Sequence, residues 1–100
     1  MQIAKVIGTV VSTQKDPSLT GSKFLLVRFI DEAGDFLSDY EVAADPNVGA
    51  GVDEWVLISR GSAARLSSGN EHRPLDALVV GIIDTVSVGN RLLYSKKNQY

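Results

Sequence analysis

The sequence predicts an all-β fold, a small five-stranded barrel of the oligonucleotide-binding-like type with one or two short helical turns. The chain of 100 residues suffices for one domain with an ordinary core. Five apolar or alternating runs have the length of β-strands. Turn-forming residues separate these runs by mostly short connections. This pattern favours a closed barrel, and a small two-sheet sandwich is the structural alternative.

The first two strands are expected at residues 3–13 and 23–31. The first run places small or apolar residues at its even positions and a mixed set at its odd positions, which is a period of two. A loop that contains Pro17 and Gly21 ends this strand. In the second run only Arg28 is polar among apolar neighbours, so both faces of this strand are expected to be buried.

The third strand is expected at residues 36–44, after a short turn that is typical of a hairpin. Its apolar residues alternate with acidic ones, so one of its faces should contact water. The fourth strand is expected at 54–60, after a glycine-spaced loop at 48–52. Both strands are short enough to fit a small barrel.

The fifth strand is expected at residues 78–88, a stretch rich in valine and isoleucine. Two short helical turns are expected before it. The first covers 61–66 with Ser62 as its N-cap, and the second covers 73–77 with Pro74 at its first position. These turns complete the predicted domain.

The barrel domain is expected to span residues 1–90, with a C-terminal tail at 91–100. The tail carries three basic residues and no acid; they are Arg91, Lys96 and Lys97. Such a short basic end is expected to be mobile.

Composition excludes several classes of function. The chain has no cysteine, which excludes disulfides, iron–sulfur clusters and cysteine-ligated zinc. His72 is its only histidine, so no histidine-rich metal site can form within one chain, and we expect neither metal nor cofactor. The longest apolar run, 77–83, is too short to cross a bilayer, and the start of the sequence resembles no signal peptide. We therefore expect a soluble cytosolic protein without membrane contact.

No pattern in the sequence indicates an active site. His72 lies in a polar stretch and is expected in an exposed loop. The chain has no nucleophile elbow of the Gly-x-Ser-x-Gly type. Its paired acids fall at expected strand ends, where carboxylates usually cap turns; they are Asp31-Glu32, Asp53-Glu54 and Asp84. We expect no catalytic residue and no enzyme.

A nucleic-acid-binding module is the alternative function for a barrel of this type. Such modules combine a basic groove with stacking aromatic side chains. Here the net charge is −2, and the basic residues are interleaved with acids. Most of the aromatic residues lie inside apolar strand runs, where core packing accounts for them. The sequence therefore disfavours nucleic acid as a partner.

Two expected strands are apolar on both faces, although a barrel takes only alternate residues of each strand into its interior. They cover the stretches 24–30 and 78–83. In the first stretch Leu25, Val27 and Phe29 are expected on one face, with apolar residues on the other as well. Monomers rarely expose large apolar patches, so we expect a neighbouring subunit to cover part of this surface.

The loop at 48–52 contains Gly49 and Gly51. It is not a dinucleotide-binding fingerprint, because no third glycine follows at the required spacing and the next element is a strand. A tight turn with positive backbone dihedrals explains these glycines, as does a close backbone approach, including one to another subunit.

Several segments of the chain, in the same order, resemble the EutN/CcmL family of bacterial microcompartment vertex proteins. They cover the chain from residue 3 to about residue 94 and comprise 3–13, 19–25, 42–45, 48–57, 61–65, 74–77 and 81–84. The segment 52–55 is similar to the carboxysome branch of the family.

The resemblance implies a homopentamer of oligonucleotide-binding-like barrels at the corners of the carboxysome shell. It implies hexameric shell proteins as partners and a structural role in carbon dioxide fixation, without a reaction of its own. Fivefold units let a flat sheet of hexamers close, and a cyclic ring needs two different complementary patches on each subunit.

The resemblance also implies candidate interface residues. Gly49 and Gly51 match the family's loop and are expected to permit close subunit approach. Glu54 and Arg65 are candidates for polar pairing across the interface, and they are equally compatible with solvated surface charges. The two lysines of the tail are candidates for contact with shell hexamers.

Overall fold

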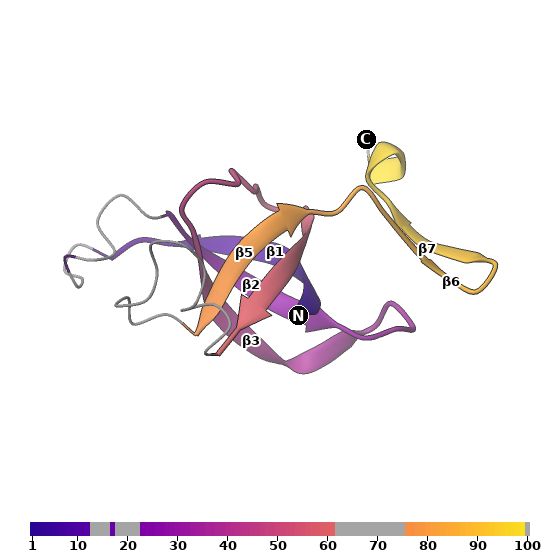
Figure 1. Cartoon of the computed structure of the whole chain (residues 1–100), viewed down its shortest axis with the longest axis horizontal. Helices are drawn as coiled ribbons and strands as arrows, with labels where there is room; N and C mark the ends of the chain where they lie inside the picture. The colour runs from indigo at the N-terminus through magenta and orange to yellow at the C-terminus, as the bar shows by residue number, and fades with distance from the viewer. Residues whose placement is uncertain (13–16, 18–22, 62–75, 100) are drawn as a thin grey trace.

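A closed barrel of five strands and a separate hairpin of two strands make up the described part of the chain (Figure 1). The computed structural model describes residues 1–12, 17, 23–61 and 76–99. The elements are β1 (Gln2–Val10), β2 (Lys23–Ile30), β3 (Phe36–Asp45), β4 (Trp55–Arg60), β5 (Ala77–Ile82), β6 (Thr85–Val88), β7 (Arg91–Ser95) and the 3-10 turn η2 (Lys96–Gln99). The predicted all-β class and five-stranded barrel are confirmed.

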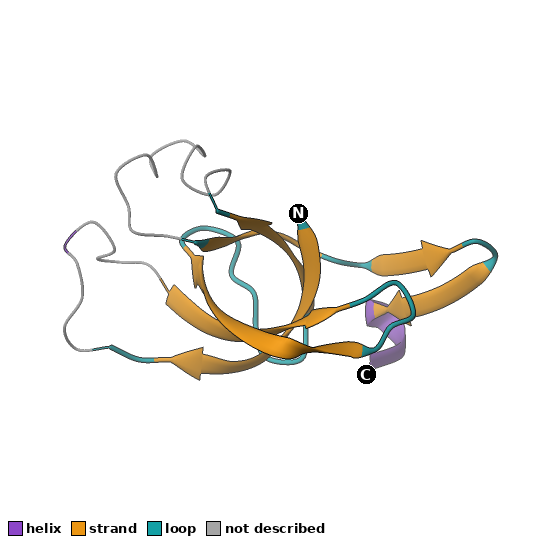
Figure 2. Cartoon of the chain, turned by 90° about the horizontal axis from the view of Figure 1, so that it is seen from below, coloured by secondary structure: helices purple, strands orange, loops and turns teal. Residues whose placement is uncertain are grey.

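The barrel closes in the strand order β1-β2-β3-β5-β4, with β4 pairing back onto β1. Four of these pairings are antiparallel, and β3 runs parallel to β5 with Ala44 opposite Leu78. Figure 2 shows the strands curving around a common axis. Closure of this kind removes most of the free edges that an open sheet would leave.

The barrel interior is filled by small and branched apolar side chains. The core cluster consists of Ala4, Val6, Leu25, Val27, Phe29, Ala43, Ala50, Val56, Ile58, Ala77 and Val79. The expected inward set on β2, Leu25 with Val27 and Phe29, is therefore confirmed. The expected alternation of β1 holds at Ala4 and Val6 and then ends, because a register shift follows Val6.

The sequence prediction of one long fifth strand at 78–88 is wrong. The structure divides this stretch into β5, which belongs to the barrel, and β6, which belongs to the hairpin. Ile83 and Asp84 lie between them. The backbone N–H of Ile83 still donates to the Trp55 carbonyl at 2.8 Å, and Asp84 is exposed. The chain thus leaves the barrel at Asp84.

The expectation of a tail without regular structure is wrong for residues 91–99. These residues form β7 and η2, and β7 pairs antiparallel with β6. The expected domain boundary at residue 90 falls in the turn of this hairpin, at Gly89-Asn90. Figure 1 shows the hairpin projecting away from the barrel, with the C-terminal turn at its base.

The two expected helical turns fall largely outside the described residues. Ser62, Pro74 and most of both turns belong to the stretch 62–75. Ala77, the last residue of the second expected turn, begins β5 instead. No helix in the described part of the chain is long and apolar enough to span a membrane.

Candidate assembly surfaces

The loop between β3 and β4 is anchored by the carboxylate of Asp45, which is buried at the end of β3. Its Oδ1 accepts hydrogen bonds from the backbone N–H groups of Val48 at 2.8 Å and Gly49 at 3.1 Å. Its Oδ2 accepts one from Ala50 at 2.6 Å. The Lys23 ammonium donates to the Ala50 carbonyl at 2.6 Å. The side chains of this chain therefore fix the loop without help from a partner.

The structure gives a different reason for glycine at each of the two positions in this loop. Gly49 has a φ of +80°, and a Cβ added there would meet nothing within 4 Å, so the requirement is conformational. At Gly51 a Cβ would lie 3.4 Å from Oε1 of Glu54. The positive backbone dihedral expected of this loop is confirmed at Gly49. The approach to another subunit stays a prediction.

Glu54 links the same loop to the C-terminal turn. Its Oε1 accepts a hydrogen bond from the Gly51 N–H at 2.6 Å, and its Oε2 forms an ion pair with the Lys96 ammonium at 2.7 Å. The hydrogen bond from Lys96 and then that from Gly51 lower the pKa of Glu54, against the raising effect of burial. Glu54 is thus a charged clamp inside the chain.

Arg65, the fourth candidate interface residue, lies outside the described residues, as does His72. Both carboxylate oxygens of Glu54 already have partners within the chain. Pairing between Glu54 and Arg65 across an interface stays a prediction.

The hairpin is held to the barrel by an aromatic stack that the sequence did not reveal. The ring centroids of Trp55 in β4 and Tyr94 in β7 lie 4.3 Å apart, with 15° between the ring planes. Tyr94 is buried by this contact. The available signal was the pair Gly89-Asn90, a two-residue hairpin turn flanked by alternating residues.

The outer face of β3 carries exposed apolar side chains. Directly opposed residues of an antiparallel pair share a face. Tyr40 opposes Arg28 and Val42 opposes Leu26, whereas Ala43 opposes the core residue Leu25. Tyr40 and Val42 therefore point outward, and they are 67% and 43% exposed. Tyr40 and Val42 thus expose apolar surface on β3 that the sequence pattern placed on the buried face.

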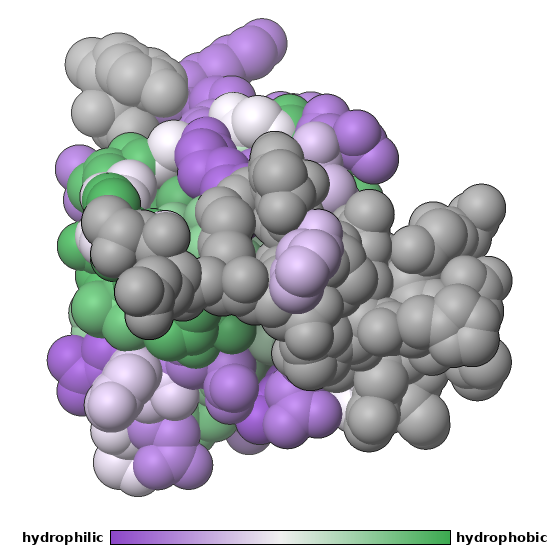
Figure 3. Space-filling model, turned by 90° about the vertical axis from the view of Figure 1, so that its left-hand side faces the viewer, coloured by the Kyte–Doolittle hydropathy of each residue, from purple (hydrophilic) through white to green (hydrophobic). Residues whose placement is uncertain are grey.

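Outward apolar surface is present on the other barrel strands to a smaller degree. Phe24 and Leu26 of β2 are half-buried, and Val80 of β5 is exposed. Figure 3 shows apolar surface gathered in one area of the face that it presents, beside polar surface. The predicted excess of apolar residues outside the core is therefore present, although its largest share lies on β3.

An apolar cleft separates the hairpin from the end of the barrel. Its volume is about 620 Å³. Residues from both bodies line it, including Ile3, Ile30, Leu37, Leu57, Val86 and Leu93. The volume lies in the range of small-molecule sites, and the lining is mostly aliphatic, with Gln2, Asp31, Glu32 and Ser87 as its polar members. Such a lining suits the side chains of a protein partner.

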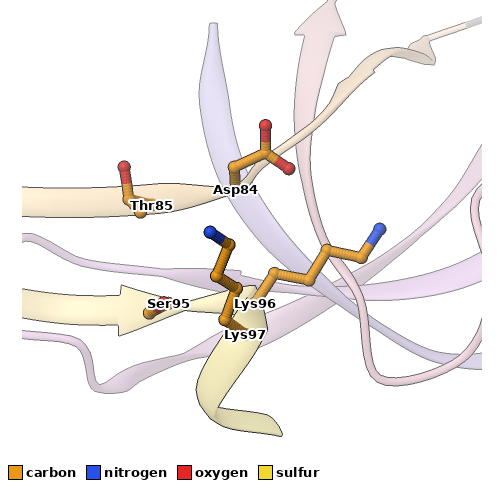
Figure 4. Close-up of a pocket in the computed structure, with 5 residues that line it drawn as sticks. All are labelled: Asp84, Thr85, Ser95, Lys96 and Lys97. Carbon is orange, nitrogen blue, oxygen red and sulfur yellow. The ribbon is translucent and has the colours of Figure 1, made fainter. Parts of the chain in front are cut away.

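A second pocket, of about 630 Å³, lies at the base of the hairpin (Figure 4). Its lining residues are Asp84, Thr85, Ser95, Lys96 and Lys97. The Lys96 N–H donates to the Asp84 carbonyl at 2.8 Å and closes the base of the hairpin. Lys97 is exposed, and its contact with a shell neighbour stays a prediction.

Some of the acids and aromatic residues that the sequence offered for chemistry have structural roles. Asp31 caps the turn before β3, because its Oδ1 accepts from Ala33 at 2.9 Å and Asp35 at 3.0 Å. Phe29 is buried in the core. In the described residues no group of three or more histidine, cysteine, aspartate or glutamate side chains could hold a metal ion.

Comparison with known proteins gives close relatives over the whole chain. The protein named "Carboxysome shell vertex protein CcmL" of Nostoc sp. is 71% identical over 100 residues, covering 100% of this chain and 99% of that protein. The solved structure of Gloeobacter violaceus CcmL is 70% identical with a TM-score of 0.89, covering 97% of this chain and 99% of the other.

A pentameric relative shares the fold as well. The GrpN pentameric microcompartment shell protein from Rhodospirillum rubrum is 47% identical with a TM-score of 0.80, covering 89% of this chain and 100% of that chain. The model of the family described as "Ethanolamine utilisation protein EutN/carboxysome" matches residues 1–84. This chain belongs to the EutN/CcmL family.

Proposed function

We propose that this protein is a shell vertex protein of the carboxysome, which forms a homopentamer at the corners of the polyhedral shell. The single observation that carries the proposal is the presence of two apolar surfaces outside a filled core. One is the outer face of β3 with Tyr40 and Val42, and the other is the hairpin with Val88 and Leu92. A cyclic head-to-tail ring requires two different surfaces of this kind on each subunit.

The similarity to named vertex proteins supports the location and the role. A relative with 71% identity over 100 residues carries the carboxysome name, and a pentameric relative has the same fold. The pentamer closes a sheet of hexameric shell proteins, which are its partners. It acts within the cytoplasm, in the shell of the compartment that fixes carbon dioxide.

The protein acts through shape and surface complementarity and catalyses no reaction. Three of the described acids serve as caps or clamps; they are Asp31, Asp45 and Glu54. The alternative, a nucleic-acid-binding module, lacks a specific observation in its favour. Of the aromatic residues such a module would need, Phe29 and Tyr94 are buried in the chain itself.

The loop at 48–54 is part of the proposed subunit interface. Gly49, Gly51 and Glu54 belong to this loop or end it, and Arg65 is the proposed polar partner across the ring. Val52, which is exposed at the tip of the loop, adds an apolar contact. The anchors at Asp45 and Glu54 preorganise the loop, which lowers the entropic cost of docking.

Two measurements test the proposal. Light scattering on the purified protein is expected to give five times the chain mass of 10.8 kDa. Co-expression with hexameric carboxysome shell proteins is expected to give closed polyhedral particles in electron micrographs, and omission of this chain is expected to leave open sheets or tubes. A monomer in the first experiment, or equal closure in both arms of the second, would contradict the proposal.

A further inference from the structure

The outer half of the β6–β7 hairpin, residues 87–92, is called the tip here and has little support from the barrel. Among the described residues β6 and β7 pair only with each other, and Figure 1 shows them extending away from the barrel. The stack of Tyr94 on Trp55 holds the base of the hairpin. A register shift between Val86 and Ser87 interrupts the ladder beyond that base, and such a bulge bends a strand. The tip is therefore expected to bend at the bulge, because a two-stranded ribbon alone is only marginally stable.

The register of the hairpin decides which side chains of the tip face the barrel. Val86 opposes Tyr94 and so lies on the face that stacks against the barrel. Val88 follows Val86 by two residues and opposes Arg91, so both belong to this same face. Leu92 lies on the opposite face. The tip thus turns one apolar side chain, 45% exposed, and one basic side chain towards the barrel.

The barrel presents a row of apolar side chains to the hairpin, called the apolar row here. Ile3 opposes Ile30 on β2 and Leu57 on β4. A core residue adjoins each of the three along its strand, so the row points out of the barrel. Val88 and the three residues of the row line the same cleft of about 620 Å³. The cleft therefore separates two apolar surfaces of one chain.

Opposite charges lie on the two sides of this cleft. Glu32 lines the cleft from the turn between β2 and β3, and Arg91 shares the hairpin face of Val88. Both charged residues are exposed, and neither forms an ion pair with another described residue. The turn lies beside the hairpin, because a Cβ added at Gly34 would be 3.7 Å from Cδ2 of Leu93. A bend of the tip towards the barrel can bring the two charges together while the apolar surfaces meet.

We propose that the tip of the hairpin bends at the bulge and closes over the cleft of its own chain. Val88 then packs on the apolar row, and the Arg91 guanidinium pairs with the Glu32 carboxylate. Removal of the apolar surfaces from water favours the closed state. Leu92 stays exposed on the opposite face, so closure determines which apolar side chain of the hairpin a neighbouring molecule meets. The inference concerns a single chain and goes beyond the proposed function.

The first test traps the closed state with a disulfide, which is feasible because the chain has no cysteine of its own. Val88→Cys is combined with Leu37→Cys, since Leu37 lines the cleft from the barrel side and is 39% exposed. The control combines Leu92→Cys with Leu37→Cys, because Leu92 lies on the opposite face of the tip. The first pair is expected to oxidise within one chain at least about tenfold faster than the control pair. Non-reducing gel electrophoresis distinguishes a bond within one chain from a bond between two chains.

The second test leaves the apolar contact unchanged and alters only the charges. Trp55 is the only tryptophan of the chain and lines the cleft, so quenching of its fluorescence by acrylamide reports closure. Arg91→Glu and Glu32→Arg are each expected to lower the ratio of closed to open chains by about two- to fivefold, which raises the quenching. Their combination in one chain is expected to restore the native quenching. Asp39→Arg is the control, because this exposed residue of β3 does not line the cleft, and its quenching is expected to stay native.

The outcomes separate this inference from the proposed function. A native pentamer in which the pair at Val88 and Leu37 oxidises no faster than the control pair overturns the closure and leaves the vertex function standing. A disulfide that forms between two chains, and not within one, overturns the closure as well. Quenching that stays raised in the double charge variant overturns the pairing of Arg91 with Glu32 and, with it, the closed arrangement. A native monomer that forms the disulfide within its own chain supports the closure and overturns the proposed function.

Discussion

Trp55 and Tyr94 stack with their ring centroids 4.3 Å apart, and this contact joins the hairpin to the barrel. Trp55 opens β4, and Tyr94 lies near the end of β7. Next to the stack, Lys96 reaches Glu54 and the Lys96 N–H reaches the Asp84 carbonyl. The hairpin therefore has a fixed base, which a projecting arm needs in order to present its tip in one direction.

Removal of the Tyr94 ring is expected to release the hairpin. Tyr94→Ala deletes a buried aromatic side chain and its stack, which costs about 3–5 kcal/mol. Urea unfolding at a fixed chain concentration measures this loss. Tyr94→Phe keeps the ring and is the control, with an expected loss of less than about 1.5 kcal/mol. Equal losses for the two variants would show that the ring contact is not the source of stability.

The clamp at Glu54 predicts a loss of stability in acid. Its pKa in the folded chain lies below the ordinary value of 4.5, so its contribution is fully present above that value. The contribution is lost as the pH falls through the lower pKa of the folded state. Urea midpoints of the native protein and of Glu54→Gln, measured between pH 3 and pH 6, are expected to converge at the acid end.

A matched variant separates the clamp from a general charge effect. Glu32→Gln removes one negative charge from the exposed turn before β3. Its stability difference from the native protein is expected to stay within about 0.5 kcal/mol. A constant gap between Glu54→Gln and the native protein over the whole pH range would contradict the role of the Glu54 carboxylate.

The loop anchor at Asp45 is expected to be more costly to remove than the turn cap at Asp31. Asp45→Ala leaves the buried N–H of Ala50 and two further donors without their acceptor, at a cost of at least about 2 kcal/mol. Asp31→Ala frees two exposed donors that water can satisfy, so the expected loss of folding stability is about 1 kcal/mol. Thermal unfolding of the two variants gives the comparison, and a reversed order would contradict it.

The barrel strands were readable from the sequence because local alternation and turn residues mark them. β2 and β4 were expected within one residue of their observed ends. The strand order was not readable, since the parallel pairing of β3 with β5 joins residues distant in the sequence. The outward orientation of Tyr40 was not readable from the sequence either, because Ala43 and its small neighbours can occupy either face of a strand.

The hairpin was missed because its first strand continues a β-rich run. Residues 78–88 contain no glycine or proline after Gly81, and only Asp84 marks the exit from the barrel. The partner in the stack, Tyr94, lay in a segment whose basic residues suggested a mobile end. Of the candidate site, the special backbone at Gly49 was readable as a glycine in a turn, whereas the Glu54 to Lys96 pair depends on tertiary packing.

Arg65 is expected to contribute to assembly through its proposed pairing across the ring. Truncation of one partner of a buried pair costs about 3–5 kcal/mol. The pentamer of Arg65→Ala is therefore expected to dissociate at higher chain concentrations than the native pentamer does. Light scattering over a dilution series measures the change. Arg60→Ala is the control, because Arg60 pairs with Glu41 inside the chain at 2.9 Å. An unchanged pentamer for Arg65→Ala would remove this residue from the interface.

A substitution at Gly49 distinguishes the needs of the fold from those of the ring. Gly49→Ala forces a Cβ into a backbone with φ of +80° but meets no atom within 4 Å in its own chain, so unfolding is expected to become easier by about 1–2 kcal/mol. If the loop faces a neighbouring subunit closely, the added methyl group also weakens assembly. Light scattering and urea unfolding on the same variant separate these effects. If the Gly49→Ala pentamer dissociates at the same concentration as the native pentamer, Gly49 is needed for the turn alone. Assembly depends on the absence of a Cβ at this position only if a neighbouring subunit lies close to it.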